Sequence, residues 1–168
     1  SFLKGWAIDR AAEYLDQLGL ENYLLEVGGD LRCAGSNPQG KNWKLGIRNP
    51  YRPNDLIATV LLGGELPCAM ASSGGYARFW TDSSTGEHHH ILNPLTGMSA
   101  RGMEGNSVIA ATAVEADFIA TWLFVVGPEE AKRVLSNQLP EVDALLMPAE
   151  GELWATPRLH HQLHFTAN

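Results

Sequence analysis

Two oxygen-bearing side chains, Asp117 and Thr121, stand four residues apart in the apolar stretch 115–127, EADFIATWLFVVG. Residues four apart lie one turn above the other on a helix, so this carboxylate and hydroxyl would share a face. An oxygen-only ligand pair suits Mg²⁺ or Ca²⁺ better than zinc, which prefers His and Cys. The structural alternative is that Asp117 caps or salt-bridges the helix start and Thr121 bonds to the preceding turn. The spacing alone leaves both interpretations open.

Lys4 and the pair Gly28-Gly29 are further candidates for contact with a ligand. Lys4 lies at the start of a helix predicted over residues 4–18, where a positive charge opposes the helix dipole. It could hold a phosphate, or it could be a solvated surface lysine. Gly28 and Gly29 follow a short predicted strand. They could let a ligand or another backbone come close, or they could mark a β-bulge.

Three consecutive histidines, His88, His89 and His90, fall in a strand predicted over residues 88–92. Alternate residues of a strand share a face, so His88 and His90 would point one way and His89 the other. The three therefore cannot bind one metal ion together. A single inward histidine that acts as a base or phosphate partner is the better hypothesis.

The elements that must position these residues can be predicted from periodicity and turn chemistry. Helices are expected over residues 4–18 and 115–127, with a further short one that begins at Pro128. Strands are expected at residues 23–27, 31–34, 43–48, 56–62, 68–72, 88–92, 107–113, 142–147 and 152–155. Gly63-Gly64 should turn the fourth strand back against the fifth, and the last two should form a hairpin. The sum is an α+β domain over residues 1–168, with a mostly antiparallel sheet and helices on one face.

Composition narrows the function classes. The 168 residues carry a formal charge of -7, which argues against a nucleic-acid or anionic-membrane surface. No apolar run reaches the ~18 residues of a membrane span. Cys33 and Cys68 are too few for a disulfide framework and lack C-x-x-C spacing, so they are expected to be small core residues. They leave the redox compartment open.

Five motifs in order carry a resemblance to a known family: K-G-W-A-I-D, V-G-G-D-L, A-S-S-G-G-Y, H-H-I-L-N-P-L-T-G and A-D-F-I-A-T. They resemble the ApbE family, the FAD:protein FMN transferases, once described as thiamine-biosynthesis lipoproteins. The resemblance runs densely over residues 4–127 and more loosely to the end. It implies a T-fold-like scaffold that binds FAD and Mg²⁺. It also implies transfer of FMN to a Thr or Ser hydroxyl of an acceptor protein, typically a respiratory flavoprotein subunit, with release of AMP.

The resemblance assigns roles to particular residues. Asp117 and Thr121 correspond to the family's metal ligands, and a main-chain carbonyl at Ser1 would complete the protein ligands. Lys4 corresponds to a lysine that contacts FAD. Leu92 would touch the cofactor through its backbone. The predicted cofactor contacts are therefore Lys4 and Leu92, together with Gly28 and Gly29.

By the same resemblance, His90 is the candidate base that activates the acceptor hydroxyl. The chain departs from the family pattern at two positions: Gly75 and Asn93 stand where aspartates are usual. Asn93 should keep its turn but not the charge.

The chain is also expected to be the C-terminal portion of a longer protein that works outside the cytoplasm, often lipid-anchored. Two other functions stay open. One is a FAD pyrophosphatase that passes FMN to water, and the other is a flavin-binding module without turnover.

Overall fold

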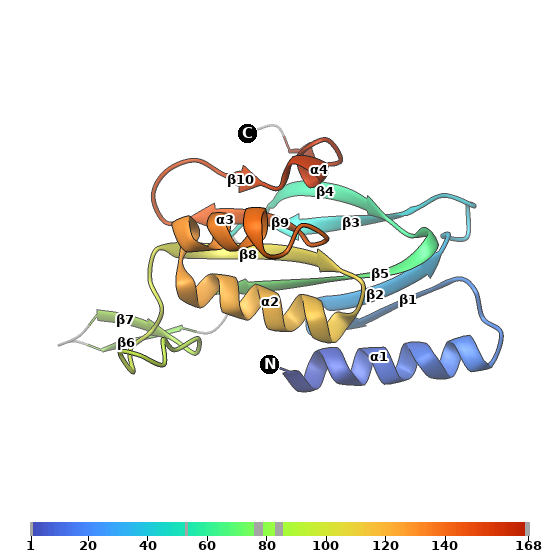
Figure 1. Ribbon diagram of the computed structural model, residues 1–168, viewed down its shortest axis with the longest axis horizontal. Helices are drawn as coiled ribbons and strands as arrows, with labels where there is room; N and C mark the ends of the chain where they lie inside the picture. Colours follow the sequence, from blue (N-terminus) through green and yellow to red (C-terminus); the bar gives the residue numbers. More distant parts are fainter. Residues whose placement is uncertain (1, 53, 76–78, 83–85, 167–168) are drawn as a thin grey trace.

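A six-stranded antiparallel sheet forms the middle layer of the molecule (Figure 1). The computed structural model describes residues 2–52, 54–75, 79–82 and 86–166. The strand order is β1-β2-β5-β8-β9-β10. The bounds are β1 (Tyr23–Val27), β2 (Asp30–Gly35), β5 (Gly64–Gly74), β8 (Met103–Ala110), β9 (Asp143–Pro148) and β10 (Trp154–Ala155). The predicted hairpin of the last two strands is confirmed, since Trp154 pairs with Leu146.

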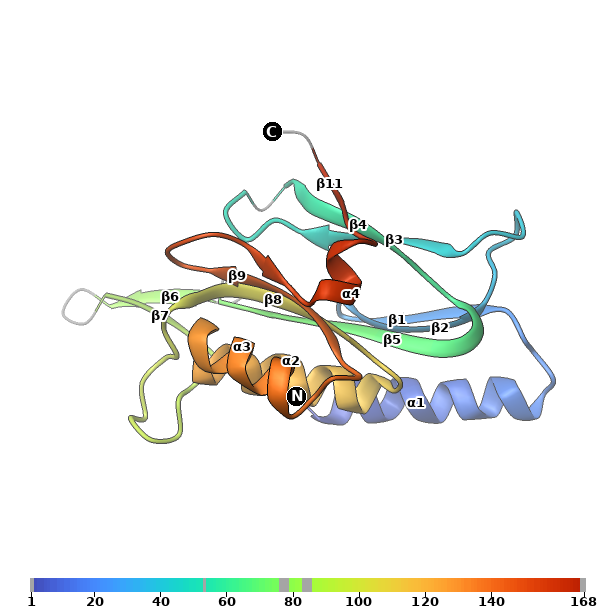
Figure 2. The same ribbon diagram turned by 45° about the horizontal axis from the view of Figure 1, so that its top comes forward.

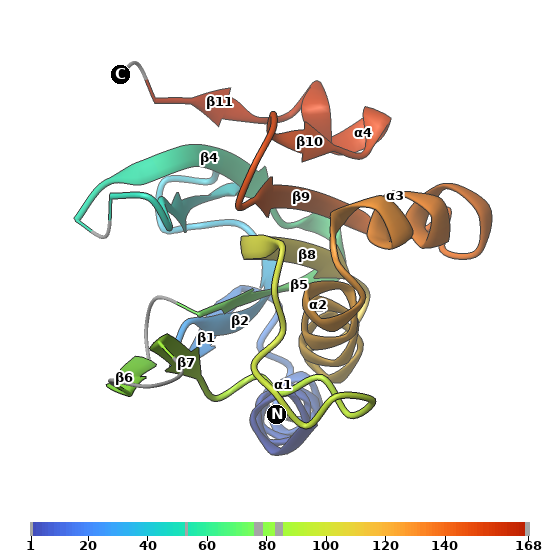
Figure 3. The ribbon, with the colours of Figure 1, turned by 90° about the vertical axis from the view of Figure 1, so that its left-hand side faces the viewer.

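Three helices cover one face of this sheet: α1 (Phe2–Gln17), α2 (Ala113–Val126) and α3 (Pro128–Asn137) (Figure 3). The apolar face predicted for α2 is buried and packs in one core with Ile8 of α1 and Val108 of β8. The helix begins two residues earlier than expected because Thr112 caps it, accepting a hydrogen bond from the Glu115 N–H. In the described part of the chain, no helix is long and apolar enough to cross a membrane.

A second sheet packs on the opposite face, so the molecule has three layers (Figure 2). Its strands are β3 (Trp43–Arg48), β4 (Leu56–Leu62) and β11 (His164–Phe165). The short helix α4 (Pro157–His160) precedes β11 along the chain. The predicted pairing of β4 with β5 is wrong, because β4 pairs with β3 and β11. Val60 of β4 packs in the core between the sheets with Met70 of β5 and Leu145 of β9. The two strands therefore meet face to face rather than edge to edge.

The histidine segment is only partly a strand. β6 (Phe79–Asp82) and β7 (Gly86–His89) form a two-stranded hairpin. The predicted continuation to residue 92 is wrong: the chain bends at His90, and Leu92 makes an isolated bridge with Ser99. A turn begins at Asn93-Pro94, so the chain does not continue the β6–β7 pairing beyond His89. The strand predicted over 107–113 also ends early, because Ala113 already belongs to α2.

Helix α1 crosses the start of α2 at close range. A Cβ added to the buried Gly5 would lie 2.6 Å from the Ala113 carbonyl oxygen and 2.7 Å from the Val114 Cα. Real Cβ atoms essentially never come that near to backbone atoms. Glycine at position 5 thus lets α1 lie directly on the backbone of α2.

We expect Gly5→Ala to destabilise the full-length protein by about 1–3 kcal/mol, because the methyl group overpacks a backbone contact. Alanine normally gains about 0.5–1 kcal/mol over glycine inside a helix, so the sign of the change is diagnostic. Urea unfolding measures it. Ala7→Gly, at an exposed position of α1, gives the size of the propensity effect alone. A stability gain in Gly5→Ala would contradict the close crossing.

Candidate functional site

One carboxylate fixes the start of α2. Asp9 of α1 accepts hydrogen bonds from the Ala113 N–H (3.0 Å) and the Val114 N–H (2.9 Å). Arg32 of β2 donates to the same carboxylate at 2.6 Å. The first N–H groups of a helix have no partner inside the helix, and a negative charge is favourable there. Asp9 therefore ties α1, β2 and α2 to one point.

Lys4 reaches into the molecule, one turn before Asp9. Its Nζ lies 2.6 Å from Oδ2 of Asp30, and Asp30 is only 2% exposed. The lysine stem passes the turn after β1: its Cδ lies 3.7 Å from where a Cβ of Gly28 would stand. The interpretation of Lys4 as a solvated surface lysine is therefore wrong, since its ammonium group is paired with a buried carboxylate.

The Gly28-Gly29 pair is a two-residue hairpin turn, not a β-bulge. Val27 pairs directly with Asp30, so only the two glycines lie between the strands. Their φ angles are 61° and 93°. A tight hairpin turn of this kind needs positive φ at both central residues, which explains glycine at both positions. The turn is exposed and lies beside the Lys4 stem.

Asp30 and Asp117 bring two buried carboxylates near each other. Asp117 is 4% exposed on the second turn of α2. Burial raises the pKa of Asp30 above its ordinary value; Lys4 opposes this rise, and the negative charge of Asp117 adds to it. Asp117 does not cap the helix, because that role belongs to Thr112. Two carboxylates in a buried place are a natural position for a cation.

Hydroxyl and amide groups adjoin these carboxylates. The Thr121 Oγ1 lies 3.4 Å from the Ser73 Oγ of β5. Asn106 of β8 pairs with Ser73 across the sheet, is fully buried, and donates from Nδ2 to the Ala120 carbonyl at 2.9 Å. Sequence reasoning did not assign Asp30, Ser73 or Asn106 to the site. The G-G-D and S-S-G motifs were the available signal for Asp30 and Ser73.

The segment that carries His90 is held by its neighbour. The His89 N–H donates to the Ser99 Oγ at 3.0 Å, the Ser99 hydroxyl donates to the His89 carbonyl at 2.9 Å, and the His89 Nε2 lies 2.9 Å from the Ala100 carbonyl. The His89 ring also meets Phe124 of α2 edge-on, at 5.4 Å between centroids. His90 itself is exposed, so the prediction that it is an inward-facing histidine on the same side as His88 is wrong. His88 is buried and stacked on Trp80.

The two departures from the family pattern have local explanations. A Cβ at Gly75 would lie 2.7 Å from Cδ2 of His89, so the histidine ring occupies the space of a side chain there. Asn93 keeps its turn, as predicted: its Oδ1 accepts from the Leu95 N–H at 2.9 Å, and its N–H donates to the Met98 carbonyl at 2.8 Å.

The remaining predicted site residues are placed less fully. Ser1 lies outside the described residues. Leu92 is 52% exposed and bonds through its backbone to Ser99. The segment between β7 and β8, which carries His90 and Leu92, lies on the helix side of the molecule (Figures 2 and 3). Among the described residues, no group of three or more His, Cys, Asp or Glu forms a metal cluster. A metal here would rely on hydroxyl or carbonyl oxygens as well.

Comparison with known proteins decides the family. Residues 1–146 match the model of the ApbE family. The chain belongs to the ApbE family. A relative from Vibrio cholerae, named FAD:protein FMN transferase, is 33% identical over 143 residues, which cover 82% of this chain and 41% of the relative. A Klebsiella pneumoniae relative of the same name is 34% identical, and the match covers 92% of this chain and 44% of the relative.

Solved ApbE structures agree with the fold. The ApbE protein of Thermotoga maritima has a TM-score of 0.82 and 30% identity, over 95% of this chain and 50% of that one. The flavin transferase ApbE of Vibrio cholerae has a TM-score of 0.78 and 28% identity over similar shares. The predicted family and α+β class are confirmed. This ApbE chain spans less than half the length of the curated relatives it matches.

We expect the stability of the protein to fall on acidification partly through His89. Burial lowers the pKa of His89 below its ordinary value. The unfolded chain then binds the proton more tightly, so this contribution is complete above about pH 6.5 and is lost as pH falls through the folded-state pKa. The thermal midpoint should drop less between about pH 7.5 and pH 5.5 in His89→Gln than in the parent. His161→Gln, at an exposed site, should follow the parent; equal drops in all three proteins would refute the prediction.

Proposed function

We propose that this chain forms the metal- and phosphate-binding part of a Mg²⁺-dependent FAD:protein FMN transferase. The observation that carries the proposal is the convergence of Lys4, Asp30 and Asp117 in a chain of the ApbE family. Lys4 pairs with the buried Asp30, and the buried carboxylate of Asp117 acts on Asp30 from α2. Such a site favours a divalent ion and, through it, a pyrophosphate.

The side chains present fit Mg²⁺. Asp117 supplies a buried carboxylate, and Thr121 supplies a hydroxyl one turn later on α2. Both are the hard oxygen donors that Mg²⁺ takes, and Mg²⁺ usually keeps several waters, so few protein ligands are needed. We assign Asp117 and Thr121 as ligands, with the Ser1 carbonyl as a further predicted one. When bound there, the ion would neutralise charge that develops on the pyrophosphate oxygens.

Lys4 and the hairpin turn beside it would hold the pyrophosphate of FAD. The Lys4 side chain is 35% exposed, so Lys4 could contact a phosphate while it stays paired with Asp30. The exposed Gly28 and Gly29 carry no side chains, so a ligand can approach the backbone there. Leu92 would contribute its backbone from the other side of the site.

His90 would act as the general base. An acceptor Thr or Ser hydroxyl gives its proton to the imidazole while its oxygen attacks the FMN-side phosphorus. The new phosphoester bond forms as the bond from that phosphorus to the AMP oxygen breaks, and AMP leaves. An exposed base suits a protein acceptor, because the hydroxyl must arrive from outside. The bonds of His89 to Ser99 and Ala100 hold the backbone that presents His90.

The acceptor and the cellular location are further parts of this proposal. An acceptor of the respiratory flavoprotein type and an extracytoplasmic, lipid-anchored protein remain predictions. Hydrolysis of FAD and simple flavin binding are the alternative outcomes of the experiments below.

We expect Asp117→Ala to lower Mg²⁺-dependent AMP release from FAD by about 100-fold or more. Metal stabilisation of transition-state charge is worth several kcal/mol, and about 1.4 kcal/mol corresponds to a factor of ten. Full-length protein, FAD and a candidate acceptor are incubated in Mg²⁺ or in EDTA, and AMP is measured by chromatography. Thr121→Val should show a smaller loss in the same direction. Asp55→Ala, an exposed carboxylate in the loop between β3 and β4, is the matched control.

The same assay separates the functions. Flavin attached to the acceptor together with AMP supports the transferase. AMP with free FMN and no labelled acceptor identifies a hydrolase, and FAD retained without AMP identifies a binding module. Unchanged turnover in Asp117→Ala would overturn the metal assignment.

We expect His90→Ala to lower transfer by about 10²–10⁴-fold, the usual contribution of a general base, without weakening FAD binding. Flavin fluorescence measures binding, and acceptor labelling measures transfer. His161→Ala, an exposed histidine of the C-terminal segment, should leave both unchanged. Parent-like transfer by His90→Ala would exclude this histidine as the base.

A further inference from the structure

The two cysteines of the chain face each other across neighbouring strands. Cys33 of β2 and Cys68 of β5 are register partners in an antiparallel ladder, and both are free thiols. Their sulfur atoms lie 3.6 Å apart. Opposed residues in such a ladder have Cα atoms about 4.5 or 5.5 Å apart, within the range of about 4.4–6.8 Å found in disulfides. Side-chain rotation can therefore bring the sulfurs to bonding distance without moving the strands.

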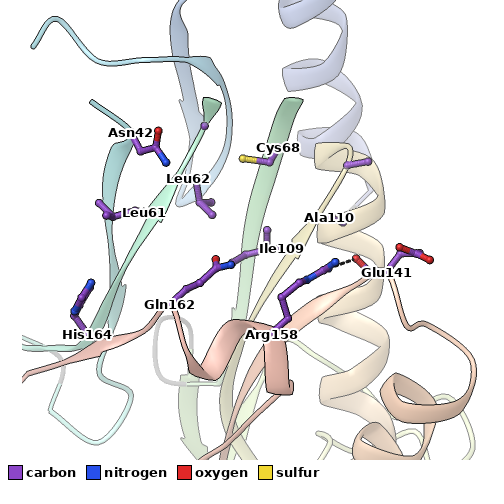
Figure 4. Close-up of a pocket in the computed structure, with 12 residues that line it drawn as sticks. Asn42, Leu61, Leu62, Cys68, Ile109, Ala110, Glu141, Arg158, Gln162 and His164 are labelled. Carbon is purple, nitrogen blue, oxygen red and sulfur yellow. Dashed lines mark hydrogen bonds between the residues drawn. The ribbon is translucent and has the colours of Figure 1, made fainter. Parts of the chain in front are cut away.

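The two thiols differ in access. Cys33 is completely buried between the two sheets. Cys68 is half-buried and lines a pocket of about 660 Å³ (Figure 4). The pocket opens between β4, the end of β8 and the C-terminal segment, away from the helix-covered face. Polar groups on its wall include Asn42, Glu141, Arg158, Gln162 and His164. A small polar molecule can reach Cys68 here, but not Cys33.

The more accessible thiol, Cys68, is also the more acidic of the two. A hydrogen bond from the Cys33 thiol, helped by the Gly63 backbone and the charge of Arg32, lowers the pKa of Cys68 to about 7. The same contact, together with burial, raises the pKa of Cys33. Thiolates, not thiols, are the nucleophiles in disulfide exchange, so the accessible sulfur is also the reactive one.

We propose that Cys33 and Cys68 form a redox-active dithiol that exchanges with low-molecular-weight disulfides entering this pocket. The Cys68 thiolate attacks one sulfur of the small disulfide, a mixed disulfide forms, and one small thiolate leaves. The Cys33 thiol then gives up its proton and attacks the Cys68 sulfur, and the second small thiol leaves. The two cysteine sulfurs are oxidised to one disulfide, and the small disulfide is reduced to two thiols.

The bond would join two strands that also carry the candidate site. On β2, Asp30 and Arg32 face the helices, while Leu31 and Cys33 face the second sheet. On β5, Ser73 contacts Thr121 of α2, while Cys68 packs in the core between the sheets. Oxidation would therefore cross-link β2 and β5 on the face of the sheet opposite the site, without occupying the site.

Oxidised glutathione is the probe, used on the full-length protein, with thiol alkylation and tryptic mass mapping as readouts. We expect two thiols to be lost together. The peptide that begins at Cys33, after cleavage at Arg32, should be found joined to the peptide that contains Cys68. Dithiothreitol should restore both thiols. Alkylation of both cysteines at the level of untreated protein would overturn the proposal.

Single variants test the order of the steps. Cys33→Ala should accumulate one glutathione on Cys68, because the resolving thiol is missing. Cys68→Ala should leave Cys33 unmodified while the protein is folded, and glutathione on Cys33 in that variant would overturn the assignment of roles. If either variant fails to fold, iodoacetamide labelling of the native parent decides: Cys68 should react at least about tenfold faster than Cys33. Equal rates would refute the asymmetry.

Discussion

The carboxylate of Asp9 is the contact on which the rest of the arrangement depends. It accepts the Ala113 and Val114 N–H groups at the start of α2 and pairs with Arg32 of β2. It therefore does for α2 what a capping side chain does, but from another helix. Gly5 permits the close crossing that this requires. Once α1 is docked in this way, Lys4 comes within reach of Asp30.

The site and the dithiol lie on opposite faces of the same two strands. The helix-covered face gathers charge and hydroxyl groups, with Lys4 offsetting part of the cost of burying Asp30 beside Asp117. The face toward the second sheet carries the thiols of Cys33 and Cys68 among apolar side chains such as Leu31 and Met70. A single layer of backbone thus separates the proposed phosphate-binding site from the proposed dithiol.

Local patterns were enough to predict some of this and not the rest. The buried face of α2, with Asp117 and Thr121 one turn apart, follows from a helical period inside one stretch of sequence. Asp30 and Ser73 could not be assigned so directly, because their partners lie on other elements and the contacts depend on docking. Asp9 and Ala113, for example, are 104 residues apart.

The second sheet was missed for a related reason. Alternation in β3 shows which side of that strand is apolar, but not which sheet that side faces, and β4 is apolar at nearly every position. The turn at Asn93 was predicted from its sequence, whereas Gly28-Gly29 was interpreted as a ligand contact or a β-bulge and forms a hairpin turn instead. The hairpin geometry and the bend at His90 needed the pairing of strands that a single sequence does not display.

The two faces of β2 carry different groups, and this limits the insertions and deletions that the strand can accept. Neighbouring residues of a strand point to opposite faces, so inserting or deleting one residue between the Gly28-Gly29 turn and Gly35 would exchange the faces of every side chain beyond that point. Arg32 would turn toward the apolar core, and Cys33 would turn toward the proposed phosphate-binding site. A point substitution in β2 changes one face of the strand, whereas a single-residue change in its length would disturb the candidate site and the proposed dithiol together.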